Sequence, residues 1–391
     1  MKRRRVVIET SCLSVRPDRL ERTGIQEVQV RLLLELPRLR ATRPDLELLA
    51  LPLPEHRQST PTLTRLIEQA SGLSSEALWG HDLLARDRSP TSAEVSSLWA
   101  SADAVHLQTI HPAQGPLLDA LDSRTGRPQV SATIFDVIPL LFPEYFPADI
   151  VDQYQAFAAA TRRHADFVVG ISRHTALDTL AMLSGPDGRP RAAYVTLPAD
   201  TGGAPWSGAR QTALLARLGL VAGSYVVVLG SVEPRKGLER LLDGFERYLR
   251  RPDARPLKLV IVGGSGWKDG PIRARMASTP ARGSIVHSGY LCDDDLAALV
   301  AASATVAMLS MYEGFGLPAA QARAAGVTPL VACGSSLPEA APGACVQVDP
   351  WDPESVAAGL DLVVRVPRRG RSDSSGWTLY AEALIELLSP A

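Results

Sequence analysis

Short runs of apolar, largely β-branched residues alternate along the chain with longer stretches in which apolar residues recur at helical spacing. This alternation is typical of a parallel β-sheet whose faces are covered by helices. In the first half of the chain the runs predict strands at residues 6–9, 46–50, 104–107, 130–134 and 167–171. In the second half they predict strands at residues 225–229, 257–262, 285–287, 305–309, 329–332 and 345–348.

Two helices of the first half are marked by their side chains. Within residues 24–39, apolar residues return every three or four positions, as on the buried face of a helix. They are Ile25, Val28, Leu32, Leu33 and Leu36. Ser172 follows the predicted strand 167–171 and has a side chain preferred at a helix N-cap, so we expect a helix from there to Met182.

A turn-rich segment with the sequence DTGGAP, residues 200–205, separates the two sets of strands and is the expected linker. We therefore predict an N-terminal Rossmann-like domain of residues 1–203 and a C-terminal one of residues 204–375; the family resemblance described below implies that the first binds the acceptor and the second the donor. The predicted fold class is α/β, with two facing doubly wound domains. Ligands of such sheets bind beyond the carboxyl ends of the strands, so we expect the site in an interdomain cleft.

Composition excludes several classes of protein. The chain has 391 residues, of which 46% are hydrophobic and 21% charged, which differs from a disordered or fibrous chain. The net charge of −1 is not that of a globally basic nucleic-acid-binding protein. No run of about 18 apolar residues is present, and the apolar run after the basic start is too short for a signal peptide. We expect a cytoplasmic protein and leave open a peripheral association with the inner face of the membrane.

The four cysteines, Cys12, Cys292, Cys333 and Cys345, show no CxxC spacing and no clustering with histidine. This arrangement fits free thiols in a reducing compartment better than a disulfide framework or a zinc site. We therefore expect no metal cofactor.

The segment Glu313-Gly-Phe-Gly-Leu-Pro318 directly follows the predicted strand 305–309. A glycine turn and a proline that opens a helix leave several backbone N–H groups without partners, and such a helix end attracts anions such as a nucleoside diphosphate. Glu313 is suited to accept hydrogen bonds from sugar hydroxyls, and Gln321 is expected to face the same site. The alternative interpretation is a tight turn with a solvated glutamate.

A second turn, Gly230-Ser-Val-Glu-Pro-Arg235-Lys236-Gly237, follows the predicted strand 225–229. Two adjacent cations suit two phosphates, because arginine offers a bidentate fork and lysine a point charge. Arg-Lys pairs most often decorate a solvated surface, which is the alternative interpretation. The functional interpretation gains support because both turns follow strands of one predicted sheet.

In the second half, the segments GSVEPRKGLERLLDGF, LVIVGGSGW, HSGYLCDDDLAALVAASATVAMLSMYEGFGLP and SSLPEA follow one another in that order. This order resembles family 4 glycosyltransferases of the GT-B fold, densely over residues 226–352. In the first half, TIFDVIPLLFPEYFP (residues 133–147) is similar to a segment of bacterial mannosyltransferases of that family. Thr23-Gly24-Ile25 resembles the glycine loop that approaches the donor phosphates, and residues 376–389 resemble a terminal helix that packs back on the first domain.

The resemblance implies roles for individual residues. Arg235 and Lys236 match the pair that binds the donor diphosphate, and Glu313 matches the first acid of the family's Glu-X7-Glu motif, which contacts the donor sugar. We therefore predict Glu313 and Asp136 as catalytic residues. The predicted donor-binding residues are Gly24, Phe135, Ser231, Arg235, Lys236, Gly264, Tyr290, Gln321 and the phosphate-cradling turn Gly314, Phe315, Gly316 and Leu317.

The chain departs from the family's pattern at two positions. Gln321 stands where the family has a second acid that holds the ribose hydroxyls, and a glutamine accepts from a hydroxyl without charge assistance. Phe135 stands where the family often has a histidine near the C6 hydroxyl of the donor sugar. Phe135 either favours a 6-deoxyhexose such as fucose or rhamnose or is a plain core substitution, and the sequence leaves both open.

Three further features have structural interpretations. Asp293-Asp294-Asp295 contains the DxD signature that binds metal in other glycosyltransferases, but an amphipathic run follows it, so we expect helix capping. The glycine run 263–266 is neither GxGxxG nor a P-loop. His106 and His111 are structural histidines or line the cleft, and the sequence does not decide between these.

We therefore expect transfer of a hexose or 6-deoxyhexose from a nucleoside-diphosphate sugar, with GDP favoured, to an acceptor hydroxyl. The resemblance implies retention of anomeric configuration and a role in bacterial polysaccharide or glycoconjugate synthesis. Arg235 and Lys236 take the role of a divalent ion at the leaving diphosphate. The acceptor is a glycan, a lipid-linked or a small molecule, and no nucleic-acid partner is expected. The open alternatives are a GT-B epimerase or phosphorylase and a non-catalytic sugar-nucleotide-binding protein.

Overall fold

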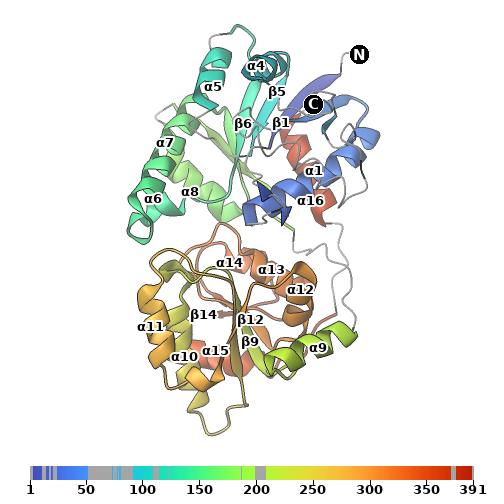
Figure 1. Ribbon diagram of the computed structural model, residues 1–391. Helices are drawn as coiled ribbons and strands as arrows, with labels where there is room; N and C mark the ends of the chain where they lie inside the picture. Colours follow the sequence, from blue (N-terminus) through green and yellow to red (C-terminus); the bar gives the residue numbers. More distant parts are fainter. Residues whose placement is uncertain are drawn as a thin grey trace. The chain divides into compact units, whose positions relative to one another are not determined.

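The computed structural model describes residues 3–10, 15–16, 19–20, 24–51, 73, 77, 79–80, 91–108, 114–122, 124–185, 187–198, 208–370 and 376–389. The chain divides into two compact units (Figure 1). Unit 1 comprises Met1–Leu140, Asp149–Thr196 and Trp377–Ala391, and unit 2 comprises Leu141–Ala148 and Leu197–Gly376. The predicted linker and domain boundary, together with Cys12, Thr23 and His111, lie outside the described residues.

Unit 1 contains a parallel sheet in the order β4-β1-β5-β6-β7-β8. Its strands are β1 (Arg4–Glu9), β4 (Leu46–Leu51), β5 (Ala104–Leu107), β6 (Gln129–Ile134), β7 (Phe167–Gly170) and β8 (Arg191–Tyr194). The five strands predicted for this half are confirmed, because each is a buried apolar run. The strand β8 was not predicted, since this edge strand is largely exposed and its sequence, RAAY, has no apolar run. A short antiparallel pair, β2 (Val15–Arg16) and β3 (Arg19–Leu20), was also missed.

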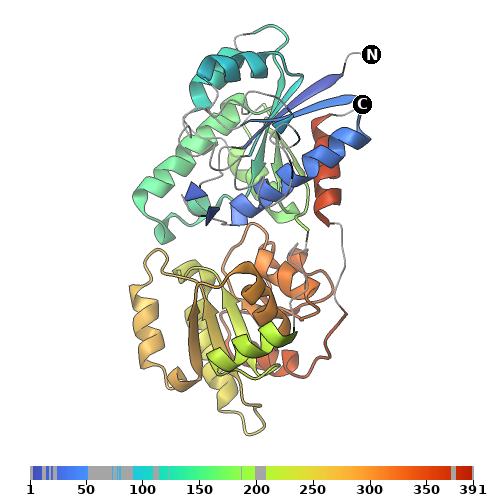
Figure 2. The same cartoon turned by 45° about the vertical axis from the view of Figure 1, so that its right-hand side comes forward.

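The described helices of unit 1 are α1 (Gly24–Thr42), α4 (Ser92–Ala100), α5 (Gly115–Asp122), α6 (Ile138–Leu141), α7 (Ala148–His164), α8 (Arg173–Leu183) and α16 (Gly376–Leu388). Two of them, α1 and α8, lie where helices were predicted for residues 24–39 and from Ser172 to Met182. Ser172 caps α8 as predicted, because its hydroxyl accepts a hydrogen bond from the Thr175 amide at 3.0 Å. Figures 1 and 2 show α16 beside α1, where Arg38 pairs with Glu382 at 2.9 Å.

Unit 2 contains a parallel sheet in the order β11-β10-β9-β12-β13-β14. Its strands are β9 (Tyr225–Leu229), β10 (Lys258–Val262), β11 (Ile285–Gly289), β12 (Thr305–Met308), β13 (Leu330–Ala332) and β14 (Val346–Val348), all of which were predicted. In chain order this is 3-2-1-4-5-6, the order of a dinucleotide-binding Rossmann sheet.

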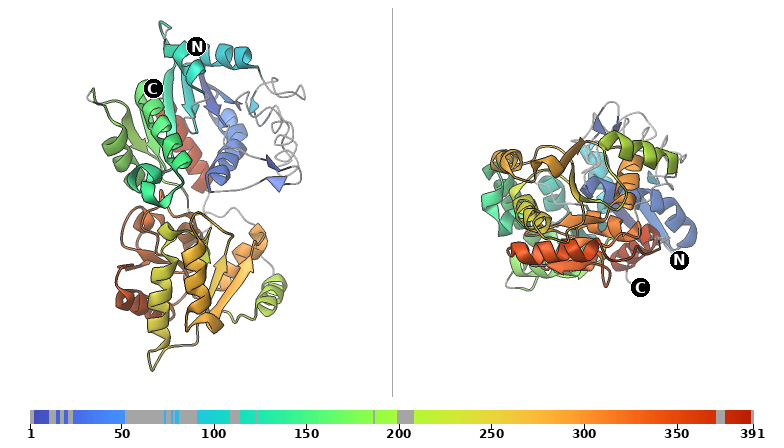
Figure 3. Two further views of the ribbon diagram at one scale, coloured as in Figure 1. Left: turned by 60° about the vertical axis from the view of Figure 1, so that its left-hand side comes forward. Right: turned by 90° about the horizontal axis from the view of Figure 1, so that it is seen from below.

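Helices cover both faces of the unit 2 sheet (Figure 3). On one face lie α10 (Leu238–Leu249), α11 (Gly270–Ser278) and α15 (Pro353–Val363). On the other face lie α9 (Gly208–Leu218), α12 (Asp293–Ala302) and α13 (Leu317–Ala324). The described part of the unit also contains four short turns of helix, at Pro143–Tyr145, Pro234–Lys236, Arg282–Ser284 and α14 (Leu337–Ala340).

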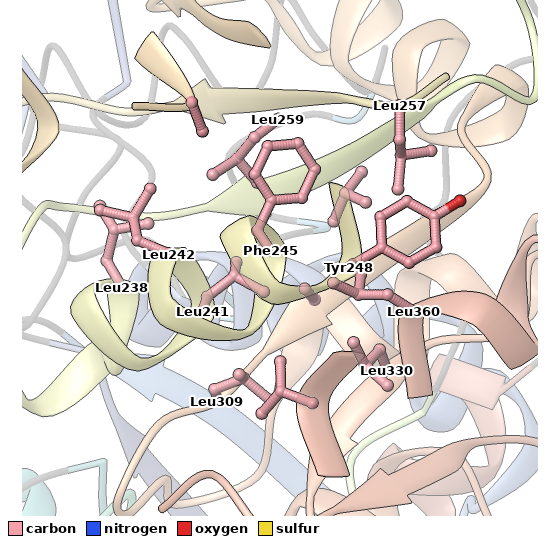
Figure 4. Packing of buried hydrophobic residues seen from close by; sticks show 14 of the residues in the cluster. Leu238, Leu241, Leu242, Phe245, Tyr248, Leu257, Leu259, Leu309, Leu330 and Leu360 are labelled. Atoms are coloured by element: carbon pink, nitrogen blue, oxygen red, sulfur yellow. The ribbon is translucent and has the colours of Figure 1, made fainter. Parts of the chain in front are cut away.

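Helix α10 anchors the core of unit 2 (Figure 4). Its fully or almost fully buried residues recur every three or four positions and are Leu238, Leu241, Leu242, Phe245 and Tyr248. The Tyr248 hydroxyl donates to the Arg255 carbonyl at 2.9 Å, so its polar group is satisfied. Burying a phenylalanine side chain such as Phe245 contributes roughly 1.5–3 kcal/mol.

Two glycines fix the position of α10. A Cβ built on Gly244 would lie 2.2 Å from Val356 Cγ1, so only glycine allows α10 and α15 to approach this closely. Gly237, directly before α10, has φ +68°, and a Cβ there would lie 2.1 Å from the Leu309 carbonyl oxygen. Helix α10 therefore begins at a defined point beside the end of β12.

No helix in the described ranges is both long and apolar enough to cross a membrane.

Candidate functional site

The candidate donor site lies where the strand order of unit 2 reverses. The strands β9 and β12 are neighbours, and from them the chain leads to β10 on one side and to β13 on the other. Sheets of this order bind ligands in the crevice beyond the carboxyl ends of these two strands. The turn after β9 carries Ser231, Arg235 and Lys236, and the turn after β12 carries Glu313 and the glycine segment.

In the turn after β9, a buried carboxylate holds Arg235. Glu233 is 7% exposed, and its Oε2 accepts a hydrogen bond from Arg235 Nε at 2.9 Å. Ser231 was predicted to contact the donor, and its hydroxyl group donates a hydrogen bond to Glu233 Oε1. Glu233 was not predicted as a site residue, although it stands in the motif EPRKG, because nothing in the sequence marks it as buried.

Glu313 joins the two turns. Lys236 Nζ lies 2.6 Å from Glu313 Oε1, and Arg235 Nη1 lies 3.4 Å from Oε2. Ser310 Oγ donates to the same Oε1 at 2.7 Å, and the Met311 amide donates to the Arg235 carbonyl at 2.8 Å. The structure thus brings together the three residues that the sequence singled out, in a cluster that is only 9% exposed at Glu313.

The charges of this cluster balance. Burial alone raises the pKa of the Glu313 carboxyl, but the charges of Lys236 and Arg235 and the hydrogen bonds from Lys236 and Ser310 outweigh it, so the pKa is lowered overall. Glu313 is therefore a carboxylate at neutral pH. The cluster contains two cations, Arg235 and Lys236, and two carboxylates, Glu233 and Glu313, so its net charge is zero.

A pair of serines supports the turn after β12. Ser336 Oγ donates to the carbonyls of Glu313 at 2.8 Å and Phe315 at 2.9 Å. Ser335 has a left-handed backbone with φ 55°, and its Oγ accepts from the Glu313 amide at 3.3 Å. These serines belong to the motif SSLPEA, and its position in the sequence does not indicate that it hydrogen-bonds the backbone of Glu313.

Helix α13 begins at Leu317, with Pro318 as its second residue. The amides of Ala319 and Ala320 both donate to the Gly316 carbonyl. Because Pro318 has no N–H and these two amides are occupied, the expectation of unpaired N–H groups now concerns the residues before Pro318. A bound anion would meet the preceding turn, in which Gly316 has φ +109° and Phe315 is 3% exposed. Gln321 lies within this helix and is half-buried.

Two further predicted residues follow the neighbouring strands. Gly264 follows β10, and a Cβ there would meet nothing within 4 Å. The fold instead requires Gly263, where a Cβ would lie 2.1 Å from the Gly230 carbonyl oxygen. Tyr290 directly follows β11 and is 78% exposed, and the sequence analysis missed Trp267, which follows β10 and is 45% exposed.

The remaining predicted residues lie in unit 1. Gly24 is the first residue of α1. Phe135 follows β6 and is 7% exposed, and Asp136 Oδ1 accepts from the Ile138 amide at 3.0 Å at the start of α6. His106 is fully buried between Ser131 and Thr133, so it is a structural histidine.

The run Asp293-Asp294-Asp295 opens α12, as predicted, but does not cap it. The N-cap residue is Cys292, and no side chain makes a capping hydrogen bond. Asp294 and Asp295 pair with Arg210 of α9 at 3.2 and 2.7 Å. In the described part of the chain, no three His, Cys, Asp or Glu residues are grouped as metal ligands.

Residues 221–371 match the protein family described as glycosyl transferases group 1. O-antigen chain mannosyltransferase B of Escherichia coli is 28% identical over 233 residues, 58% of this chain and 59% of that protein. Mannosylfructose-phosphate synthase of Agrobacterium fabrum is 29% identical over 203 residues, 47% of this chain and 44% of that protein. The chain thus spans less than two thirds of the length of these relatives.

The whole chain is similar in fold to the crystal structure of HepE from Anabaena in complex with UDP and glucose. The TM-score is 0.60 at 14% identity, covering 98% of this chain and 95% of that one. This similarity extends the predicted GT-B fold of two parallel-sheet α/β domains over both units. Residues 221–371 thus match a glycosyl transferases group 1 domain, in a chain that has the GT-B fold and resembles family 4 glycosyltransferases such as bacterial mannosyltransferases.

Proposed function

We propose that this protein is a glycosyltransferase that moves a hexose from a GDP-linked donor to an acceptor hydroxyl, with retention of anomeric configuration. The observation that carries the proposal is the Arg235–Glu313–Lys236 cluster at the strand-order reversal of unit 2. It combines two cations suited to a diphosphate with a carboxylate suited to sugar hydroxyls.

In the proposed reaction, the bond from sugar C1 to the leaving phosphate oxygen breaks while a bond to the acceptor oxygen forms, and the proton of the acceptor hydroxyl passes to the leaving diphosphate. Negative charge grows on the diphosphate and positive charge on the sugar ring. Lys236 and Arg235 would stabilise the first and Glu313 the second, and such fixed charges contribute about 2.7–4 kcal/mol per group in other enzymes. Because Glu313 holds both cations in the free protein, a bound diphosphate must share or displace these ion pairs.

For the base, we propose that the ring stacks on the exposed aromatic residues Trp267 and Tyr290, which follow the neighbouring strands β10 and β11. GDP is favoured because residues 133–147 are similar to a segment of bacterial mannosyltransferases. The names of the relatives, a mannosyltransferase and a mannosylfructose-phosphate synthase, support mannose as the sugar. We propose that Phe135 is a core residue and not a contact to a 6-deoxy sugar, in keeping with the names of these relatives.

The wider setting is also a proposal. We propose synthesis of a polysaccharide or glycoconjugate at the cytoplasmic side of the membrane, with a glycan, lipid-linked or small-molecule acceptor. We propose that no metal takes part, and transfer should therefore persist in EDTA. A strict and reversible requirement for manganese or magnesium would contradict this.

Nucleotide binding and sugar transfer test the proposal separately. Stabilisation by GDP, UDP and ADP and by their sugars is measured by thermal unfolding, where a ligand at 100 times its Kd adds about 2.7 kcal/mol. Transfer from GDP-mannose to mannosides is measured as GDP release. Glu313→Gln should lose at least a hundredfold in transfer while remaining folded. Glu354→Gln, which removes an exposed carboxylate paired with Arg247, is the matched control and should keep full activity.

The second candidate is a non-catalytic sugar-nucleotide-binding protein, which Gln321 favours because it replaces an acid of the family's motif. Stabilisation by a nucleotide sugar without transfer or hydrolysis would favour it. A wild-type protein that no nucleotide stabilises, or a folded Glu313→Gln variant with activity within twofold of wild type, would contradict the proposed enzyme.

A further inference from the structure

A second set of polar side chains lies at the strand-order reversal of unit 1. The next two strands of this sheet after β1, which are β4 and β5, lie on opposite sides of it (Figure 1). Thr10 directly follows β1, and Gln108 directly follows β5. Sheets of this order bind ligands at the carboxyl ends of the two strands that flank the reversal.

The strand register places these residues on one face of the sheet. Ile8 is paired with His106, and His106 with Ser131. If each pairing is continued by two residues, Thr10 lies opposite Gln108, and Gln108 lies opposite Thr133. Side chains along a strand alternate between the two faces with a period of two, so all of these residues lie on the same face of the sheet. We call the set Thr10, His106, Gln108, Ser131 and Thr133 the unit 1 polar row.

Only part of this row is satisfied internally. The two ring nitrogens of His106 each lie 2.9 Å from a hydroxyl, one of Ser131 and one of Thr133. In contrast, Thr10 Oγ1 and both polar atoms of the Gln108 amide are buried and have no hydrogen-bond partner among the residues that the structure describes. Thr10 is 2% exposed and Gln108 is 0% exposed. Leaving such groups unpaired destabilises a fold, so a ligand that supplies the missing partners would remove that penalty.

The unit 1 polar row carries no charge at neutral pH. Burial lowers the pKa of His106 to about 3, so the imidazole is neutral, and the other members are hydroxyl and amide groups. A phosphate group prefers cations such as the Arg235–Lys236 pair of unit 2. Hydroxyls and amides instead both donate and accept hydrogen bonds, and so do the hydroxyls of an uncharged sugar.

We infer that the unit 1 polar row binds the hydroxyl groups of an uncharged, unphosphorylated pyranose through the Gln108 amide and the Thr10 hydroxyl. The inference rests on the proposed function and names the class of substrate that this unit recognises. The pyranose is either the acceptor or the sugar of the donor, which share this chemistry.

Three variants test the inference. Gln108→Leu and Thr10→Val remove the unpaired polar atoms at nearly constant volume. The matched control is Thr328→Val in unit 2, because Thr328 Oγ1 is also buried without a partner. All three variants should melt at a higher temperature than wild type. Only Gln108→Leu and Thr10→Val should weaken binding of methyl α-D-mannopyranoside, by at least tenfold, while GDP binding stays within twofold of wild type.

Two measurements distinguish whether the bound pyranose is the acceptor or the sugar of the donor. A rise in KM for the methyl mannoside with an unchanged KM for GDP-mannose supports the row as an acceptor site. A loss of GDP-mannose affinity at unchanged GDP affinity supports it as a site for the donor sugar. Unchanged affinity of Gln108→Leu for both sugars would overturn the inference, as would mannose 6-phosphate binding wild type at least tenfold more tightly than mannose.

Failure of the proposed function has a different signature. If no nucleotide stabilises the wild-type protein, the proposed enzyme is wrong. Stabilisation by methyl α-D-mannopyranoside alone, and its loss in Gln108→Leu, still supports the row as a sugar site, and an absence of any such stabilisation in wild type contradicts it.

Discussion

Removing the buried carboxylate of Glu233 should strengthen donor binding. In the free protein, Arg235 and Lys236 are neutralised by Glu233 and Glu313. Glu233→Gln keeps the size of the side chain, and its amide oxygen can still accept from Arg235 Nε. The net charge of the cluster changes from 0 to +1 through the loss of one carboxylate, so a nucleoside diphosphate should meet a net attraction in the variant.

The magnitude follows from the distance between charges. Glu233 Oε2 lies 2.9 Å from Arg235 Nε, on the near side of the guanidinium. A phosphate on the far side of that planar group would lie roughly 6–7 Å from the carboxylate. At an effective dielectric constant near 20, the repulsion at that distance is about 2.5 kcal/mol. If water and salt screen half of this, the variant gains about 1.3 kcal/mol, which is about a tenfold lower Kd.

Isothermal titration with GDP and with guanosine measures this effect. Guanosine lacks the phosphates and should bind wild type and Glu233→Gln equally. Glu239→Gln removes an exposed carboxylate from the first turn of α10 and is the charge-matched control, with an expected change below twofold because solvent screens it. Weaker GDP binding by Glu233→Gln would refute the reasoning, because Glu233 would then act by orienting Arg235.

Phe245→Ala should lower the free energy of unfolding by about 3–5 kcal/mol in urea, because the ring is fully buried (Figure 4), and a loss below about 1 kcal/mol would be inconsistent with that packing. Because the pKa of Glu313 is lowered in the folded protein, its carboxylate stabilises the fold at any pH above 4.5, the ordinary pKa of a glutamate. This stabilisation disappears as the pH falls through the lower pKa that Glu313 has in the folded protein. Wild type should therefore lose more stability than Glu313→Gln on acidification below pH 4.5, and parallel acid profiles would argue against the ion pairs. Wild type should use GDP-mannose in preference to GDP-rhamnose, and Phe135→His should leave that ratio unchanged; a shift toward mannose in the variant would place Phe135 against the donor sugar.

The strands could be predicted because of where they lie. β9 and β12 are central and covered on both faces, so they appear in the sequence as unbroken apolar runs. β8 lies at an edge of its sheet and was not predicted. Its exposed positions are occupied by arginine and tyrosine, so it does not appear in the sequence as an apolar run. The strands of the sheets could be predicted because both of their faces are buried, and not from strand propensity alone.

The site could be predicted only in part. Arg235, Lys236 and Glu313 stand out in the sequence because they are charged residues in turns, rich in glycine and proline, that follow buried strands. Ser336 acts on the turn that carries Glu313, so its role depends on which turns lie side by side. Glu233 acts on Ser231 and Arg235 of its own turn, and its role depends on a burial that the sequence does not mark. The sequence pattern alone does not encode those contacts.

The close approach of α10 and α15 has a consequence for engineering. Lys236 stands directly before Gly237 at the start of α10, and Gly244 lies about 11 Å further along the helix. Any side chain at Gly244 must push α10 away from Val356, and the shift of the helix moves Lys236 relative to Glu313. Directed evolution for a new donor would therefore find productive substitutions along this distant helix contact, and a library confined to the residues around the diphosphate would miss them.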